Sequence, residues 1–306
     1  MPWAIALFST PSDATLRLAL RLTFWACAAA TVFLLGVGLR ALLGGNIAVV
    51  ASGRFELATL NPIWVGHLGL SLAILALFRL QTEGLRRQAS AVAFVVAGAL
   101  GLLFVGISGS KGPMVALIVS FSLLLMVDWI RGRRGRAVAE GVVATTLSIP
   151  LVFVLEQRFG FTILSRFRDA VEPGEHGSVT ERIELFRRAR DEFLSHPITG
   201  GALEDREWLM YPHNTFIESF MATGIVGGTA YVVFHIGALL SAIRLAVSTP
   251  SAAWLSILCV QYTIAALFSG SLYTWNTLWG LLAAVIAAQS HRVVHVRSFV
   301  AIPAGA

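Results

Sequence analysis

Long apolar stretches, separated by short clusters of charged residues, make up most of the 306-residue chain. A helix needs about 20 mostly apolar residues to cross a bilayer, because each residue advances it by ~1.5 Å through ~30 Å of hydrocarbon. The pattern therefore predicts an all-α integral membrane protein with about eight spanning helices in a single membrane domain, 1–306. The expected spans are 20–43, 62–80, 90–107, 113–130, 137–156, 214–241, 252–269 and 275–290.

Composition supports this interpretation and excludes others. Only 13% of the residues are charged and 56% are hydrophobic, whereas a soluble domain carries about 25% charged residues. The net charge of +6 does not indicate nucleic-acid binding, since the positive residues follow the ends of apolar stretches. Cys27 and Cys259 lie inside apolar spans without metal-ligand spacing. The first apolar stretch is longer than a signal-peptide core, so we expect a retained span.

The arginines between the spans predict the orientation. If eight spans alternate in direction, most of these arginines fall on one side, and the positive-inside rule makes that side cytoplasmic. Both termini would then be cytoplasmic, and 44–61, 108–112, 157–213 and 270–274 would be extracytoplasmic. The cytoplasmic set is Arg17, Arg21, Arg79, Arg86, Arg87, Arg131, Arg133, Arg134, Arg136, Arg244, Arg292 and Arg297; the short opposite loops hold Arg40, Arg54 and Lys111.

The 157–213 segment is the one large loop that this topology predicts. Its middle has the pattern of an amphipathic helix that begins at a Ser178–Glu181 capping box and ends near Pro197 and Gly200-Gly201. Such a helix can lie on the membrane surface and cover a site. Its apolar stripe consists of Val179, Ile183, Phe186 and Phe193.

A glycine-rich turn, Ser108-Gly109-Ser110-Lys111-Gly112, joins two spans on the predicted outer side. Backbone N–H groups, the Ser110 hydroxyl and the Lys111 ammonium are groups that can bind phosphate. Lys111 is also the one lysine in the chain. The alternative is a tight interhelical turn with a lysine that extends toward the interface.

A second group of candidates precedes and enters the sixth span. His213 can take a proton from an attacking hydroxyl, while Asn214 can instead cap the following helix. Glu218 lies one turn inside, where an acid is costly unless paired; it would accept a hydrogen bond from the site or neutralise a loop arginine. Arg182 borders the apolar stripe of the loop helix and can face a lipid pyrophosphate, although a solvated position is the ordinary alternative.

Other polar and aromatic residues within the spans have structural interpretations. His67 and His235 are single histidines inside spans. Tyr273, Trp275 and Trp279 have the composition of an interfacial aromatic belt.

The order of these motifs resembles that of the bacterial O-antigen ligase and O-antigen polymerase superfamily. His213-Asn214, followed by Gly224 and Gly227, is similar to its His-Asn…Gly-x-x-Gly signature. Thr180 through Phe186 and His196 through Gly200 resemble its outer-loop pattern. The 108–112 turn and Arg54 through Asn61-Pro62 match two further motifs, with lysine in place of the usual arginine in the first. The resemblance covers about 90–240.

This resemblance implies a GT-C-type membrane glycosyltransferase without metal, nucleotide or other cofactor. Its donor would be an undecaprenyl-diphosphate-linked glycan, and its acceptor a hydroxyl of lipid A-core, a glycan or another molecule. Lys111 and Arg182 would hold the pyrophosphate, and His213 would act as the base or orient the donor. Ser110, Asn214, Arg54 and Glu218 would complete the substrate site.

Two departures from the family pattern have consequences. Lysine lacks the bidentate fork that arginine offers a phosphate. The chain also has fewer spans than most relatives, so part of the N-terminal lipid groove is expected to be absent.

The expected location is a bacterial inner membrane, with the active site facing the periplasm and membrane lipids around the helices. A flippase or transporter of lipid-linked glycans is the first alternative, although repeats and midplane charges typical of transporters are not visible. A non-catalytic relative is the second.

Overall fold

The computed structural model describes residues 12–43, 61–82, 88–135, 137–139, 141–142, 146, 157 and 178–300. Within this part of the chain the regular structure is entirely helical, and six helices are long and apolar enough to cross a membrane. The chain is therefore a multi-pass membrane protein. The six are α2 (Asp13–Leu43), α4 (Pro62–Thr82), α5 (Gln88–Ile107), α6 (Lys111–Ile130), α10 (Thr215–Ser248) and α11 (Ala253–Phe268), the last preceded by the 3-10 turn Pro250–Ala252.

These helices confirm six of the eight predicted spans. The predicted span 275–290 corresponds to α12 (Asn276–Val300), whose apolar part, Asn276–Gln289, is shorter than the others. The predicted span 137–156 lies mostly outside the described residues. Arg54 also lies outside them.

The two central helices, α4 and α11, are the most buried of the bundle. Glycines allow close contact between α4 and α5, since a Cβ at Gly69 would approach the Gly101 carbonyl oxygen to 2.5 Å. Buried polar groups join α4 to α11: the Gln261 amide donates to the His67 carbonyl at 2.9 Å and to the Ser71 hydroxyl at 3.0 Å. Small residues and interhelical hydrogen bonds are what hold helices together in lipid.

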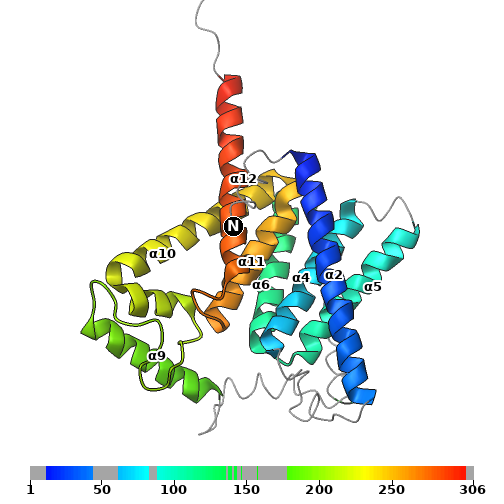
Figure 1. Ribbon diagram of the computed structural model, residues 1–306. Helices are drawn as coiled ribbons and strands as arrows, with labels where there is room; N and C mark the ends of the chain where they lie inside the picture. Colours follow the sequence, from blue (N-terminus) through cyan, green and yellow to red (C-terminus); the bar gives the residue numbers. More distant parts are fainter. Residues whose placement is uncertain are drawn as a thin grey trace, which may run out of the picture.

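The helices alternate in direction, so the connections gather at two ends of the bundle (Figure 1). At one end the Arg131 guanidinium donates to the Ala246 and Val247 carbonyls of α10. The Ser251 hydroxyl donates to the Asp13 carboxylate at this end, with 2.7 Å between the oxygens. The turn before α6, the start of α10 and the turn after α11 lie at the other end, which we call the site end.

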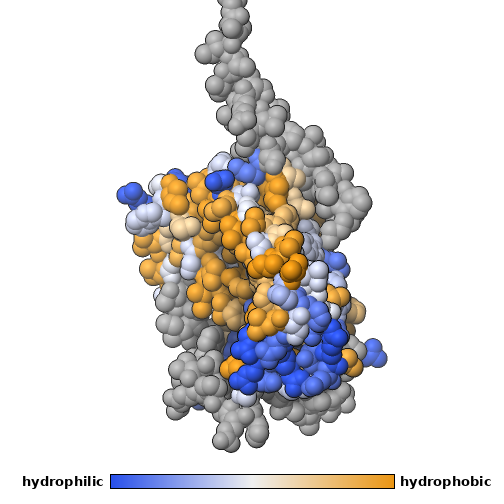
Figure 2. Space-filling model, turned by 90° about the vertical axis from the view of Figure 1, so that its left-hand side faces the viewer, coloured by the Kyte–Doolittle hydropathy of each residue, from blue (hydrophilic) through white to orange (hydrophobic). Residues whose placement is uncertain are grey.

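Beside the bundle, α9 (Ser178–Ser195) packs along α10 and confirms the predicted helix of the large loop (Figure 1). Its buried face carries Leu185 and Ala189, whereas Ile183 is exposed. Figure 2 views the side where α9 and α10 lie, and shows a hydrophilic patch directly below a mainly apolar surface.

Candidate functional site

The end of α11 connects the two motifs that the sequence singles out. A Cβ at Gly112 would lie 3.2 Å from the Phe268 Cβ, so the turn before α6 rests on the last residue of α11. The side-chain amide of Asn214 donates to the carbonyl of Leu267, the residue before Phe268, at 3.3 Å. The 108–112 turn and the His213-Asn214 pair therefore lie at the same end of the bundle, although about 100 residues separate them in the sequence.

Hydrogen bonds within the 108–112 turn fix its shape. The Ser108 hydroxyl donates to the Val105 carbonyl at 2.8 Å, and the Ser110 hydroxyl donates to the Ser108 carbonyl at 3.1 Å. Both serines are buried, so these hydroxyls hold the turn. Gly109 supplies the left-handed conformation, with φ 56°. Lys111 is the first residue of α6 and is half-buried.

Asn214 is the N-cap of α10. Its side-chain oxygen accepts from the backbone N–H groups of Phe216 and Ile217, at 3.0 and 3.1 Å. This is the capping function considered from the sequence, and the amide contact with Leu267 adds a tie to α11. His213, directly before the cap, has φ 56° and is half-buried. Its ring meets that of Tyr211 edge-on, with 4.6 Å between centroids.

The electrostatic surroundings of His213 favour the neutral imidazole. Burial lowers the pKa of His213, and the positive charge of Arg182 lowers it further, while Glu181 acts in the opposite direction. Burial also lowers the pKa of Arg182, but a guanidinium keeps its charge in proteins. At neutral pH His213 is therefore uncharged and can accept a proton.

Glu218 is fully buried one turn inside α10. Both of its carboxylate oxygens accept from the backbone N–H of Leu272, each at 3.1 Å. The Leu272 carbonyl in turn accepts from the Trp279 indole at 3.0 Å. Within the described part of the chain, Glu218 thus holds the loop between α11 and α12 and does not pair with a loop arginine.

The predicted aromatic belt is wrong for Trp275. Its side chain is buried, donates to the Ser269 carbonyl at 2.8 Å and packs on Trp64 with 4.6 Å between ring centroids. The loop turns Trp275 into the core because its indole N–H finds a backbone acceptor there. Tyr273 is the exposed member, and its hydroxyl donates to Glu204 at 3.0 Å.

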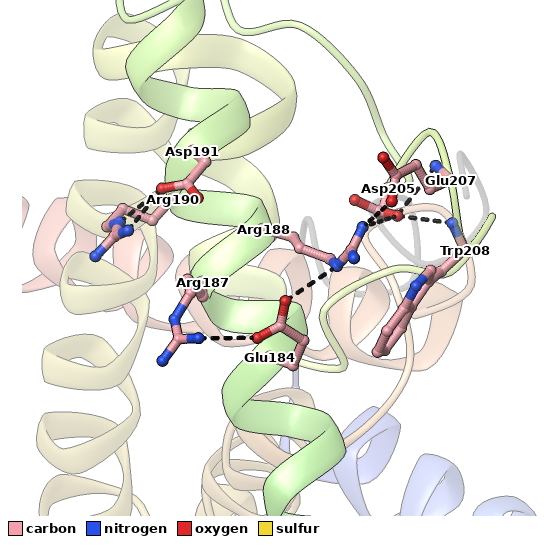
Figure 3. Close-up of polar contacts among 8 residues, drawn as sticks. All are labelled: Glu184, Arg187, Arg188, Arg190, Asp191, Asp205, Glu207 and Trp208. Carbon is pink, nitrogen blue, oxygen red and sulfur yellow. Dashed lines mark hydrogen bonds and ion pairs between the residues drawn. The ribbon is translucent and has the colours of Figure 1, made fainter.

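Arg188 organises the chain that follows α9, which sequence reasoning did not reveal (Figure 3). Its guanidinium lies 2.6 Å from the Glu207 carboxylate and 3.5 Å from that of Asp205, and also contacts Glu184 at 3.3 Å. Hydrogen bonding to Glu207 raises the pKa of Arg188. The same group stacks over Trp208, 4.6 Å from the ring centroid. Helical spacing predicts only the Glu184 contact, since the other partners come from a separate segment.

No group of three His, Cys, Asp or Glu side chains in the described residues is arranged to hold a metal ion. The site end offers a neutral imidazole, whose pKa the charge of Arg182 lowers, together with a turn that carries Lys111. Such groups suit proton transfer beside an anion.

Comparison with known families agrees with this arrangement. A family model described as O-antigen ligase matches residues 93–232, a range that includes the 108–112 turn, α9 and the His213-Asn214 pair. No curated protein matches the chain. Residues 93–232 are therefore similar to the O-antigen ligase family, which supports the resemblance to the O-antigen ligase and polymerase superfamily.

Proposed function

We propose that this protein transfers a glycan from a polyprenyl-diphosphate-linked donor, of the undecaprenyl type, to an acceptor hydroxyl at the periplasmic face of a bacterial inner membrane. The observation that carries the proposal is the arrangement at the site end: the turn with Lys111 and the His213-Asn214 pair both adjoin the end of α11. The positive charge of Arg182 contributes to the lowered pKa of His213. The family match over residues 93–232 supports glycosyl transfer in general.

In this reaction the bond between the sugar anomeric carbon and the phosphate oxygen breaks, and a bond to the acceptor oxygen forms. His213 takes the proton of the acceptor hydroxyl, and polyprenyl diphosphate leaves with the electron pair. The cations of Lys111 and Arg182 stabilise the charge that accumulates on the leaving pyrophosphate. The neutral state of His213 at pH 7 suits the role of base.

The membrane setting is part of the same proposal. The cytoplasmic termini and a GT-C-like arrangement with eight spans would put the site end in the periplasm, where a lipid-linked donor presents its pyrophosphate at the interface. The acceptor would be lipid A-core or a growing glycan. The lysine at position 111 would contact phosphate as a point charge.

The test is transfer by the purified protein in proteoliposomes that contain a polyprenyl-diphosphate-linked oligosaccharide and a lipid A-core acceptor, or a glycan acceptor in a parallel reaction. We expect glycosylated acceptor and free polyprenyl diphosphate in equal amounts. Movement of intact donor between leaflets, without either product, would instead indicate a flippase. Absence of both activities in well-folded protein would indicate a non-catalytic relative.

A further inference from the structure

The helix α10 is interrupted at Gly224, where φ is 65° and ψ is −164°. In an uninterrupted helix the N–H of Ile225 would donate to the carbonyl of Met221. Here the Ile225 N–H donates to the Pro197 carbonyl at 2.8 Å, and the Met221 carbonyl accepts from the Gly201 N–H at 3.0 Å. The segment 196–201, which we call the brace, thus binds both backbone groups that the interruption separates.

Glycines make this contact possible. A Cβ at Gly200, where φ is 75°, would collide with the backbone of Ala222. A Cβ at Gly224 would collide with the Ile198 carbonyl. The brace and the interruption therefore fit each other backbone to backbone. The brace is also tied within itself, because the Gly200 N–H donates to the His196 carbonyl at 2.9 Å.

The half of α10 before the interruption, 215–223, carries the candidate chemistry. His213 and Asn214 stand at its N-terminus, and Glu218 extends from it to the loop after α11. Because Gly224 is not helical, the long half of α10 does not fix the direction of this short half. Its direction depends on the brace and on its contacts with α11 and the loop that follows.

We propose that the brace is a positioning element that sets the short half of α10, and with it His213, relative to the turn that carries Lys111. The consequence for catalysis rests on the proposed function. Lys111 lies on α6, outside both the short half and the brace, whereas Arg182 lies on α9, which leads directly into the brace. The base therefore moves relative to the Lys111 contact with pyrophosphate when the contacts of α10 with the brace are lost, and that contact does not depend on the brace. Loosening it is expected to lower kcat more than it raises KM for the donor.

The first variant is Ile225→Pro. Position 225 follows the extended ψ of Gly224 and begins the long half of α10, where proline suits both the residue before it and the first helical position. The ring removes the N–H that donates to the Pro197 carbonyl and presses on that oxygen. Ile225→Ala keeps the N–H and is the matched control; the Ile225 side chain is 49% exposed, so its loss is tolerated.

The second variant, Gly200→Ala, changes the brace itself and leaves the spanning helices unaltered. Its control is Gly132→Ala, since Gly132 has a similar φ of 78° but nothing within 4 Å of an added Cβ. Both substitutions carry the same left-handed strain, so the difference between them reports the contact with α10.

Amide hydrogen exchange and transfer kinetics are then measured on all four proteins and wild type. We expect faster exchange in 213–223 for Ile225→Pro and Gly200→Ala, unchanged exchange in 230–248, and a kcat about 10- to 100-fold lower, since misplacement by about 1 Å costs ~100-fold. Donor KM should stay within about twofold. The two controls should match wild type.

Unchanged exchange in 213–223 would overturn the proposal that the brace positions the short half of α10. An unchanged kcat in both variants of an active enzyme would overturn it as well. Exchange requires no substrate, so the two proposals fail separately. Faster exchange in the variants of a protein whose wild type transfers no glycan supports the brace and overturns the proposed function.

Discussion

The N-cap of α10 provides a prediction in which stability and activity can be measured separately. Asn214→Ala removes the acceptor for two backbone N–H groups and the donor to the Leu267 carbonyl. Loss of the cap costs about 0.5–2 kcal/mol, and loss of the amide contact costs about 0.5–1.5 kcal/mol. The free energy of unfolding should therefore fall by about 1–3.5 kcal/mol. Asn214→Asp keeps the cap acceptor, so it should lose only the second contribution.

The assay is SDS-driven unfolding in mixed micelles, followed by helicity, with transfer measured on the same preparations. Ser12→Ala is the matched control, because the Ser12 hydroxyl accepts from the Thr15 N–H at 3.1 Å at the start of α2. It should cost about 0.5–2 kcal/mol and leave transfer unchanged, since Ser12 lies at the opposite end of the bundle. Asn214→Ala should lose transfer as well as stability. Wild-type stability of Asn214→Ala would contradict the capping role of Asn214.

Three other predictions follow from the site end. Arg182→Gln removes a charge that lowers the pKa of His213, so the acidic limb of the pH–rate profile should move to higher pH. An unmoved limb would show that the charge of Arg182 does not act on the pKa of the base. Gly66→Ala puts a methyl group 2.6 Å from the turn before α6 and should cost about 1–3 kcal/mol in the free energy of unfolding, with reduced transfer. In a cysteine-free background, Leu203→Cys should react with an impermeant thiol reagent in spheroplasts and Gly135→Cys should not; reversed labelling would contradict the orientation.

The spanning helices are predictable from sequence because lipid requires each crossing segment to be apolar and to satisfy its own backbone. The predicted spans 90–107 and 252–269 thus nearly coincide with α5 and α11. The interruption of α10 is not predictable in this way. The Gly224 pattern is visible in the sequence, but an isolated glycine is compatible with a straight helix. The left-handed backbone is stabilised by Pro197 and Gly201, which lie in a different segment.

The candidate site shows the same division between local and long-range information. The capping role of Asn214 follows from the residue and its place before a helix. The cost of burying Glu218 also follows from its depth, but its partner, the Leu272 N–H, is 54 residues away in the sequence. The coupling between Arg182 and His213 likewise joins α9 to the start of α10. Pairings of this kind depend on how separate elements meet.

The most direct test of the account is transfer by His213→Ala and His213→Gln, each purified from membranes in amounts equal to wild type. A positioned base contributes typically ~10²–10⁴-fold, and glutamine keeps polarity and similar size but cannot take a proton near neutral pH. If His213 is the base, both variants should lose transfer by at least about 100-fold while remaining folded. Substantial activity in His213→Gln alone would assign His213 to orientation of the donor. Wild-type transfer by well-inserted His213→Ala would contradict the catalytic assignment.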